Sequence, residues 1–471
     1  MRYLPHTDEE IREMLERIGV AHVDTLFEAI PESYRLNRPL ALEPQLDEGQ
    51  LMAHLETLSH KNSAVSKLSF LGGGMYDHHI PPAVDQLLLR SEFYTAYTPY
   101  QAEYSQGTLQ AIFEFQTLVC QLLGMEVANA SMYDGASAAA EAVLMARRGT
   151  HKRNVLVSEG VHPEYIATVR TYLAGMGEEK SLKLVPLAGD GRTDLAALSN
   201  AFDDDTACVL VGYPNFFGVV EDLAAIRDIS APRGAQLISA TGEVYALSLI
   251  KPPGELGVDI AVAEGQSLAV PPQLGGPGVG LFACRSSAVG KMPGRLCGET
   301  VDANGLRGFV LTLSTREQHI RRERATSNIC TNHGLIALAF TIRVSMLGKT
   351  GFRQAGELCL SKAEYLKTAI ARLPGYKLPL SAPTFNEFLV ECSGRAATDV
   401  LAKLAGQDIL GGVALERFDS ELTNLGGRFD SQLAHHGDRL DAARKSQFLV
   451  AVTERHTRED LDRLVSALAA A

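Results

Sequence analysis

The sequence has few basic residues for its length. Lys and Arg number 44 against 56 Asp and Glu, which gives a formal net charge of −12. Nucleic acids and anionic membranes bind clustered Lys and Arg, so this balance disfavours both as partners. The densest basic stretch, residues 316–324, carries two Glu of its own and is typical of a helical surface with charge pairs.

The sequence also lacks paired cysteines and long apolar runs. Its seven Cys never occur as Cys-x-x-Cys, which predicts neither a disulfide framework nor a zinc site. The first residues lack an apolar signal segment, and no window approaches the roughly 18 uncharged apolar residues that a membrane span requires. We therefore expect a cytoplasmic protein with no membrane partner.

The composition is otherwise that of a folded globular protein, with 46% hydrophobic and 21% charged residues over 471 positions. A chain of this length exceeds what one core usually supports, so we expect two unequal domains. Thr7 and Glu10 form a predicted capping box for a first helix that ends at Gly19. Residues 1–65 then show few strand signals and are predicted to form an N-terminal helical arm.

From about residue 128 short apolar runs alternate with helical patterns. The runs at 154–158, 207–214 and 235–241 are separated by amphipathic stretches, and the alternation continues to about residue 283. This pattern predicts a parallel sheet covered by helices on both faces, an α/β fold. We predict a large α/β domain at 66–345 and a small C-terminal α/β domain at 346–471.

Two glycine-containing segments have competing interpretations. Gly72–Gly74 lacks the G-x-x-x-x-G-K pattern of a nucleotide loop and is interpreted as a turn more readily than as a binding loop. Asp134 and Gly135 precede a strong helix, whose first amides could bind an anion, although Asp134 is the better candidate for an N-cap. His78 and His79 are adjacent and point apart, so no metal site is predicted.

Residues 94–110 contain Tyr94, Tyr97, Tyr100 and Tyr104 with small polar side chains. Tyrosines this dense can form the wall of a cofactor or substrate site, or an interface patch, and the residues alone favour neither. The Pro- and Gly-rich loop at 266–280 follows a strand of the predicted sheet. Loops at this end of a parallel sheet usually carry function.

Four long segments resemble the glycine decarboxylase P-protein, in particular subunit 1 of its split bacterial form. They are SFLGGGMYDHHIPP, RSEFYTAYTPYQAEYSQGTLQAIFEFQTLVCQLLGMEVANASMYDGASAAAEA, LIKPPGELGVDIAVAEGQSLAVPPQLGGPGVG and PGRLCGETVDANGLRGFVLTLSTREQHIRRERATSNICTN. The resemblance implies the PLP-dependent transferase fold of type I, similar to aspartate aminotransferase. Such a fold has a large and a small α/β domain.

The resemblance also implies that this chain holds no pyridoxal phosphate (PLP) by itself. Catalytic members carry a Schiff-base lysine just before the Gly-rich loop, where this chain has Gln266 and Ser267. No lysine lies between Lys251 and Lys291. The acid expected near the end of the preceding strand is missing at 239–241, and Asp134 leads the phosphate loop.

The resemblance therefore implies a site shared with a lysine-bearing subunit 2. The candidates from this chain are Tyr97, Tyr100, Tyr104, Ser105 and Gln106, with Tyr76, Asp134, His162 and Arg316 as weaker ones. His162 is expected rather to pack or cap a helix than to stack on a cofactor.

The implied activity is that of glycine dehydrogenase (decarboxylating), in which this chain is inactive alone. Subunit 2 would hold PLP, remove CO2 from glycine and pass the aminomethyl group to the lipoyl arm of H-protein. The implied assembly has two copies of each subunit. One alternative is a structural or regulatory scaffold for subunit 2, and another is an independent PLP enzyme, which the missing lysine argues against.

Overall fold

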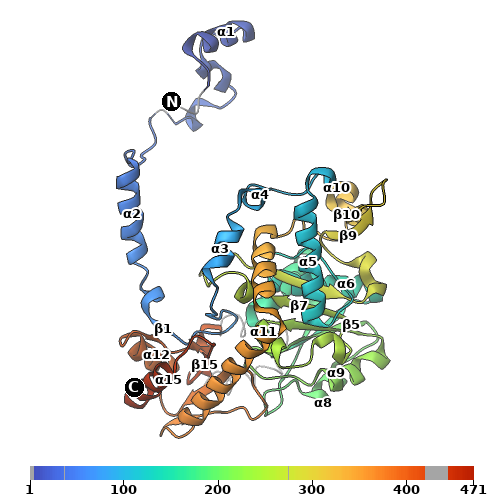
Figure 1. Cartoon of the computed structure of the whole chain (residues 1–471), viewed down its shortest axis with the longest axis vertical. Coiled ribbons are helices and arrows are strands. Elements are labelled where there is room, and N and C mark those ends of the chain that lie inside the picture. Colours follow the sequence, from blue (N-terminus) through green and yellow to red (C-terminus); the bar gives the residue numbers. More distant parts are fainter. Residues whose placement is uncertain (1–4, 37, 274, 419–443) are drawn as a thin grey trace. The chain divides into compact units, whose positions relative to one another are not determined.

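Figure 1 shows the chain as a computed structural model that describes residues 5–36, 38–273, 275–418 and 444–471. Residues 1–4 of the predicted arm, Leu274 of the Gly-rich loop and residues 419–443 of the predicted C-terminal domain lie outside this description. The chain divides into two compact units, Met1–Val65 and Ser66–Ala471.

The first unit is helical. Helix α1 (Asp8–Ile18) begins at the predicted Thr7–Glu10 capping box and ends at Gly19, whose φ of 86° suits glycine. Two 3-10 turns, Val23–Phe27 and Glu32–Tyr34, lead to α2 (Glu48–His60). None of the residues in these four elements is buried, so the described elements of this unit form no core of their own.

The second unit is built on a seven-stranded sheet of strand order β2-β8-β7-β6-β5-β3-β4. The parallel strands are β4 (Leu182–Val185), β3 (Asn154–Ser158), β5 (Thr206–Gly212), β6 (Gln236–Thr241) and β7 (Ile260–Glu264). The prediction of parallel strands to residue 283 is wrong for β8 (Gly280–Cys284), which runs antiparallel to β7 and to β2 (Val127–Ala128). Among its described residues, the loop before β8 has only the 3-10 turn Gln266–Leu268, whereas a parallel connection needs a crossover, usually a helix.

Apolar side chains alternate between the two faces of the sheet, and helices cover both. Val209 and Val211 of β5 belong to a core with α5 (Gln106–Leu123) and α11 (Gly334–Ile370). Cys208 and Leu210 belong to the opposite core, with α6 (Gly135–Thr150) and α7 (Pro163–Gly175). Every residue of β5 is buried, as the unbroken apolar run predicted.

The C-terminal part has a four-stranded antiparallel sheet of order β11-β12-β15-β14. Its strands are β11 (Tyr376–Lys377), β12 (Glu387–Cys392), β15 (Gln447–Ala451) and β14 (Val413–Ala414), accompanied by α12 (Ala397–Ala405) and α15 (Arg458–Ala470). β1 (Leu68–Ser69) pairs with β13 (Ile409–Leu410), so residues near the start of this unit contact its C-terminal part. The predicted domain boundary at 345/346 falls inside α11 and stays a prediction.

Among the described residues, α11 is the one helix long and apolar enough to cross a membrane. α11 carries Arg343 and Lys349 and contains no run of 18 uncharged residues, so the expectation about uncharged apolar runs is not contradicted. Residues of α11 belong to a core of the folded unit. The helix packs on α5, where the rings of Phe340 and Phe115 meet edge to face at 5.3 Å, and Gly348, with φ 58° and ψ 180°, interrupts the helix.

Candidate functional site

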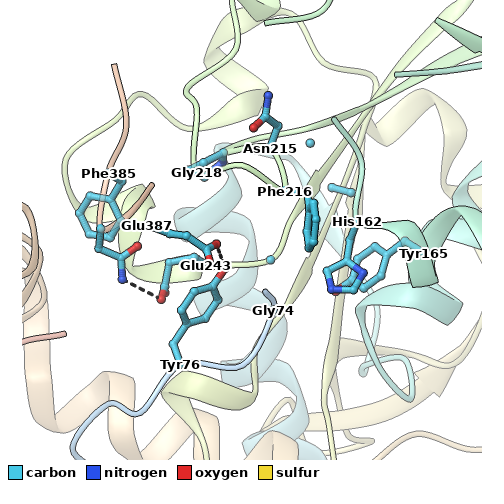
Figure 2. Close-up of a pocket in the computed structure, with 15 residues that line it drawn as sticks. Gly74, Tyr76, His162, Tyr165, Asn215, Phe216, Gly218, Glu243, Phe385 and Glu387 are labelled. Carbon is cyan, nitrogen blue, oxygen red and sulfur yellow. Dashed lines mark hydrogen bonds between the residues drawn. The ribbon is translucent and has the colours of Figure 1, made fainter. Parts of the chain in front are cut away.

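A small cavity lies beyond the ends of β5 and β6, facing the C-terminal sheet (Figure 2). Residues from five places in the sequence line it, including Gly74, Tyr76, His162, Tyr165, Asn215, Glu243, Asn386 and Glu387. Its volume is about 30 Å³, room for about two water molecules. The predicted candidates Tyr76 and His162 both lie here.

Glu387 closes one side of this cavity. It begins β12 and is buried, and its carboxylate accepts the Gly73 N–H at 2.6 Å and the Tyr76 hydroxyl at 2.8 Å (Figure 2). Burial raises the pKa of Glu387 to about 7 and also raises the pKa of Tyr76. Tyr76 is therefore bound to an acid of this same chain.

Glu243 is an acid at the end of β6 that the sequence analysis missed. The strand ends at Thr241, and the chain then turns at Gly242 so that Glu243 is buried in the cavity. The acid was expected at residues 239–241, whereas Glu243 lies two residues beyond the end of the strand. The Glu243 carboxylate accepts from the Asn386 amide at 3.2 Å and from the His78 ring at 2.9 Å.

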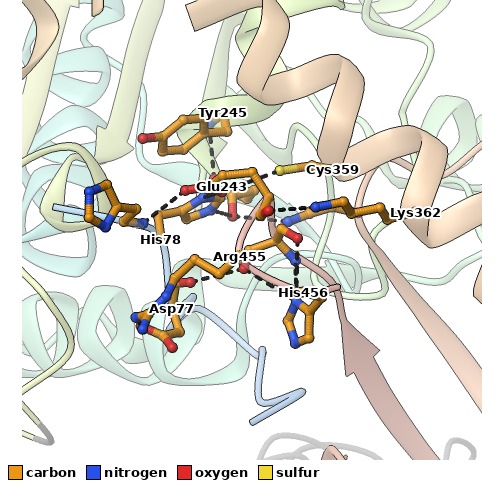
Figure 3. Close-up of polar contacts among 12 residues, drawn as sticks. Asp77, His78, Glu243, Tyr245, Cys359, Lys362, Arg455 and His456 are labelled. Carbon is orange, nitrogen blue, oxygen red and sulfur yellow. Dashed lines mark hydrogen bonds and ion pairs between the residues drawn. The ribbon is translucent and has the colours of Figure 1, made fainter. Parts of the chain in front are cut away.

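His78 donates to two carboxylates (Figure 3). Its Nε2 lies 2.9 Å from Glu243 and its Nδ1 lies 2.6 Å from Glu454, while the Tyr245 ring stacks on it at 3.9 Å. Burial alone lowers the pKa of His78, but the two carboxylates overcome this and raise it to about 9. His78, Cys359 and Glu454 lie close enough to hold a metal, yet both ring nitrogens of His78 are already bound to carboxylates.

The region expected to carry the Schiff-base lysine is occupied by Gln266 and Ser267, at the turn after β7. The Gln266 side-chain amide donates to the Val270 carbonyl. The Ser267 hydroxyl is buried and has no hydrogen-bond partner among the described residues. Neither side chain can form a Schiff base with a carbonyl group.

Asp134 and His162 both cap helices, as the preferred interpretations predicted. Asp134 is the N-cap of α6 and accepts the Ser137 N–H at 2.7 Å. His162 is the N-cap of α7: its Nδ1 accepts the Glu164 N–H at 3.1 Å and its Nε2 donates to the Gly73 carbonyl at 2.7 Å. Burial lowers the pKa of His162, consistent with a neutral ring.

The tyrosine segment presents its rings to solvent. Tyr97, Tyr100 and Tyr104 are 84%, 81% and 88% exposed. Tyr100 lines an open hollow of about 1140 Å³ with Arg295 and His319, and Tyr97 lines a second hollow of about 200 Å³. Neither hollow shares a lining residue with the small cavity, so the strong candidates and Tyr76 are not brought together.

The other candidates near this segment serve the local fold. Gln106 donates to the Ala102 and Phe309 carbonyls and accepts the Phe309 N–H at 2.8 Å, which fastens α5 to β10 (Arg307–Thr312). Ser105 precedes α5 without a side-chain capping bond. Arg316 is buried, and its guanidinium donates to the carbonyls of three residues, Met292, Gly294 and Leu313.

The chain is similar to proteins described as probable glycine dehydrogenase (decarboxylating) subunit 1. It is 58% identical to that of Sorangium cellulosum, covering 100% of this chain and 99% of the relative, and 47% identical to that of Desulforamulus reducens, covering 100% of each. A crystal structure of glycine decarboxylase (P-protein), in inhibitor-bound form, matches with a TM-score of 0.85 and 41% identity over 100% of both chains.

More distant structures share the fold alone. A sphingosine-1-phosphate lyase from Burkholderia pseudomallei is 14% identical, with a TM-score of 0.64 over 94% of each chain. A NifS-like protein from Rickettsia africae is 13% identical, with a TM-score of 0.61 over 85% of this chain and 98% of its own. The fold is therefore that of PLP-dependent enzymes of fold type I, as predicted.

The residues of this chain nevertheless do not fit PLP. Gln266 and Ser267 offer no amine, Glu243 is paired with His78, and the cavity of about 30 Å³ is far smaller than a pocket for a cofactor.

A family model described as the glycine cleavage system P-protein matches residues 1–426. Together with the full-length relatives, this match shows that the chain belongs to the glycine cleavage system P-protein family.

Proposed function

We propose that this chain is the lysine-free subunit of a two-subunit glycine decarboxylase and completes an active site whose PLP is held by a lysine-bearing partner subunit. The observation that carries the proposal is the contrast between two regions of the chain. Its own cavity is too small for the cofactor, whereas Tyr97, Tyr100 and Tyr104 are more than 80% exposed. The "subunit 1" names of the relatives support the existence of a partner.

The exposed tyrosines suit the wall of a shared cleft. Each presents a rigid ring with a hydroxyl at its tip, so one side chain can exclude water and also donate a hydrogen bond. Tyr100 lies beside Arg295 and His319 in the larger hollow, and Glu317 of the same hollow lies 3.7 Å from the Arg295 guanidinium and 3.5 Å from the His319 ring. We assign to this segment the orientation of glycine and the exclusion of water during loss of CO2.

PLP bound in the partner would supply the electron sink that stabilises the negative charge left when glycine loses CO2. The acceptor in this proposal is the lipoyl disulfide of H-protein. Glycine loses CO2, its aminomethyl group forms a bond to one lipoyl sulfur, the S–S bond breaks, and the other sulfur becomes a thiol. We propose two copies of each subunit and a cytoplasmic location, which the seven free cysteines support.

Alanine substitutions at the three tyrosines test the proposal in the assembled complex with its partner. We expect at least one of Tyr97→Ala, Tyr100→Ala and Tyr104→Ala to lower kcat/KM for glycine by about tenfold or more, about 1.4 kcal/mol of transition-state stabilisation. Glycine–CO2 exchange measures the rate, and size-exclusion chromatography verifies the assembly.

Tyr34→Ala is the matched control, because Tyr34 is 81% exposed but lies in the first unit. Its complex should exchange CO2 at the wild-type rate. If all three tyrosine variants assemble and also keep the wild-type rate, the segment contributes nothing to the chemistry and a scaffold role replaces the proposal.

A further inference from the structure

We infer that this chain has closed the remnant of its own cofactor site with its own side chains, and that the Glu264 carboxylate takes the place of a bound phosphate. Glu264 ends β7 and reaches the N-terminus of α6. The inference stands on contacts within this chain and does not depend on what a partner subunit does.

Three backbone N–H groups converge on the Glu264 carboxylate, as they would on a bound anion. Gly135, the first residue of α6, donates at 2.8 Å, Gln266 at 2.9 Å and Val279 at 3.0 Å. Free amides at a helix N-terminus attract anions because their dipoles align. Here these amides are satisfied from inside the chain, so none of the three is left for a phosphate oxygen.

The surroundings of Glu264 further oppose an incoming anion. Asp134 places a second carboxylate on the first turn of α6, where it accepts the Ser137 N–H. Burial raises the pKa of Glu264 to about 7 despite the three N–H groups, and the Asp134 charge adds to the rise. The Tyr165 hydroxyl packs over Gly135 and leaves no room for even a Cβ there. A phosphate would be repelled by two carboxylates and would clash with the Tyr165 hydroxyl.

The other end of the remnant is closed by Glu387 from the C-terminal sheet. Its carboxylate binds the Tyr76 hydroxyl (Figure 2) and the Gly73 N–H, and the His162 ring donates to the Gly73 carbonyl. These contacts reduce the cavity to about 30 Å³. Side chains therefore fill both ends, Glu264 near α6 and Glu387 with Tyr76 near β12.

The test is a gain of binding by the full-length chain. With inorganic phosphate as the probe at pH 8, 31P NMR titration should show no saturable binding to the wild type. Glu264→Ala frees the three amides, so this variant should bind phosphate at least tenfold more tightly than the wild type does. Glu126→Ala is the matched control, because Glu126 also accepts a backbone N–H, from Ser286 at 2.8 Å, but at an exposed site. That variant should gain nothing.

Two results would overturn the inference: saturable phosphate binding by the wild type, or a folded Glu264→Ala protein that binds no more tightly than the wild type. If Glu264→Ala does not fold, a crystal structure of the wild type grown in phosphate decides. The Glu264 carboxylate should still lie on the three amides. Phosphate oxygens on Gly135, Gln266 and Val279, with Glu264 turned away, would contradict the inference.

Discussion

The Nδ1 atom of His78 lies 2.6 Å from a carboxylate oxygen of Glu454, and both residues are largely withdrawn from solvent. His78 precedes α3 (Pro82–Leu88), whereas Glu454 follows β15, so the pair joins residues 376 positions apart. Glu243 holds the other ring nitrogen from the end of β6. One buried imidazolium thus connects three segments around the small cavity (Figure 3).

We predict that this imidazolium makes stability depend on pH. The pKa of His78 is about 9 in the folded chain against 6.5 for an ordinary histidine. A folded pKa above the unfolded one gives stability that is fully present below about 6.5 and lost as pH rises through 9. The expected loss is roughly 3 kcal/mol, from about 1.4 kcal/mol for each pKa unit. Urea unfolding between pH 7 and 9.5 measures most of it.

Removing the imidazolium should abolish this dependence and lower stability. His78→Gln leaves two buried carboxylates without their cation, which costs about 3–5 kcal/mol at pH 7. His79→Gln is the control, since this exposed neighbour makes its hydrogen bonds through its backbone, donating its N–H to Glu454 and accepting from Arg343 at its carbonyl. Equal pH profiles for wild type and His78→Gln would show that His78 is not charged in the folded chain.

Glu387 should give a pH dependence in a lower window. Its folded pKa of about 7 exceeds the ordinary value of 4.5, so its contribution to stability is present below 4.5 and lost as pH rises through 7. Glu387→Gln removes the buried charge but keeps an oxygen to accept from Gly73 and Tyr76. This variant should unfold at an equal or higher temperature than the wild type at pH 8.

The matched control is Glu391→Gln on the same strand, whose carboxylate accepts a hydrogen bond from Gln447 and is half-buried. It should leave the thermal profile between pH 4.5 and 7 unchanged. A Glu387→Gln protein that melts several degrees below the wild type at pH 8 would indicate that the ionised carboxylate stabilises the cavity, contrary to this account.

Gln106 and Tyr97 should respond differently to alanine. Gln106 makes three hydrogen bonds to backbone groups, two of them to Phe309 in β10, so Gln106→Ala should cost about 1–3 kcal/mol of unfolding free energy. Tyr97 is 84% exposed, and Tyr97→Ala should change stability by less than about 0.5 kcal/mol. Denaturant unfolding of the single chain measures both values.

Gln110→Ala on the same helix is the control for loss of an exposed glutamine, since its amide binds only Glu114. A Gln106→Ala chain as stable as this control would mean that the bonds to β10 contribute nothing.

Local patterns in the sequence predicted the framework of the fold. The capping box at Thr7 and the apolar runs of β3, β5 and β6 depend on neighbours within a few residues, and the structure confirms them. The antiparallel direction of β8 was missed although the sequence held a signal for it. The Pro- and Gly-rich loop at 266–280 has no helical pattern, whereas a parallel strand needs a crossover that is usually a helix.

The closing of the cavity could not be predicted from local patterns. His78 and Glu454 are 376 residues apart, and Gly73 and Glu387 are 314 apart. In the sequence, Glu264 is a polar residue at the end of an apolar strand. Only the tertiary structure shows that its carboxylate accepts the Gly135 N–H. For Glu243 the sequence held a signal, because an acid stands two residues past a buried strand and directly after a glycine. Glu243 was therefore the candidate for the acid expected near the end of this strand, which residues 239–241 lack.

The shared active site is tested most directly by glycine–CO2 exchange with PLP and lipoylated H-protein. The rate is measured for this chain alone, for the lysine-bearing subunit alone and for the two together. We predict exchange only in the mixture, because we propose that the partner holds the cofactor and that this chain supplies the tyrosine segment to the shared site. Exchange by this chain alone would contradict the account of its closed cavity. Full exchange by the partner alone would contradict the shared site.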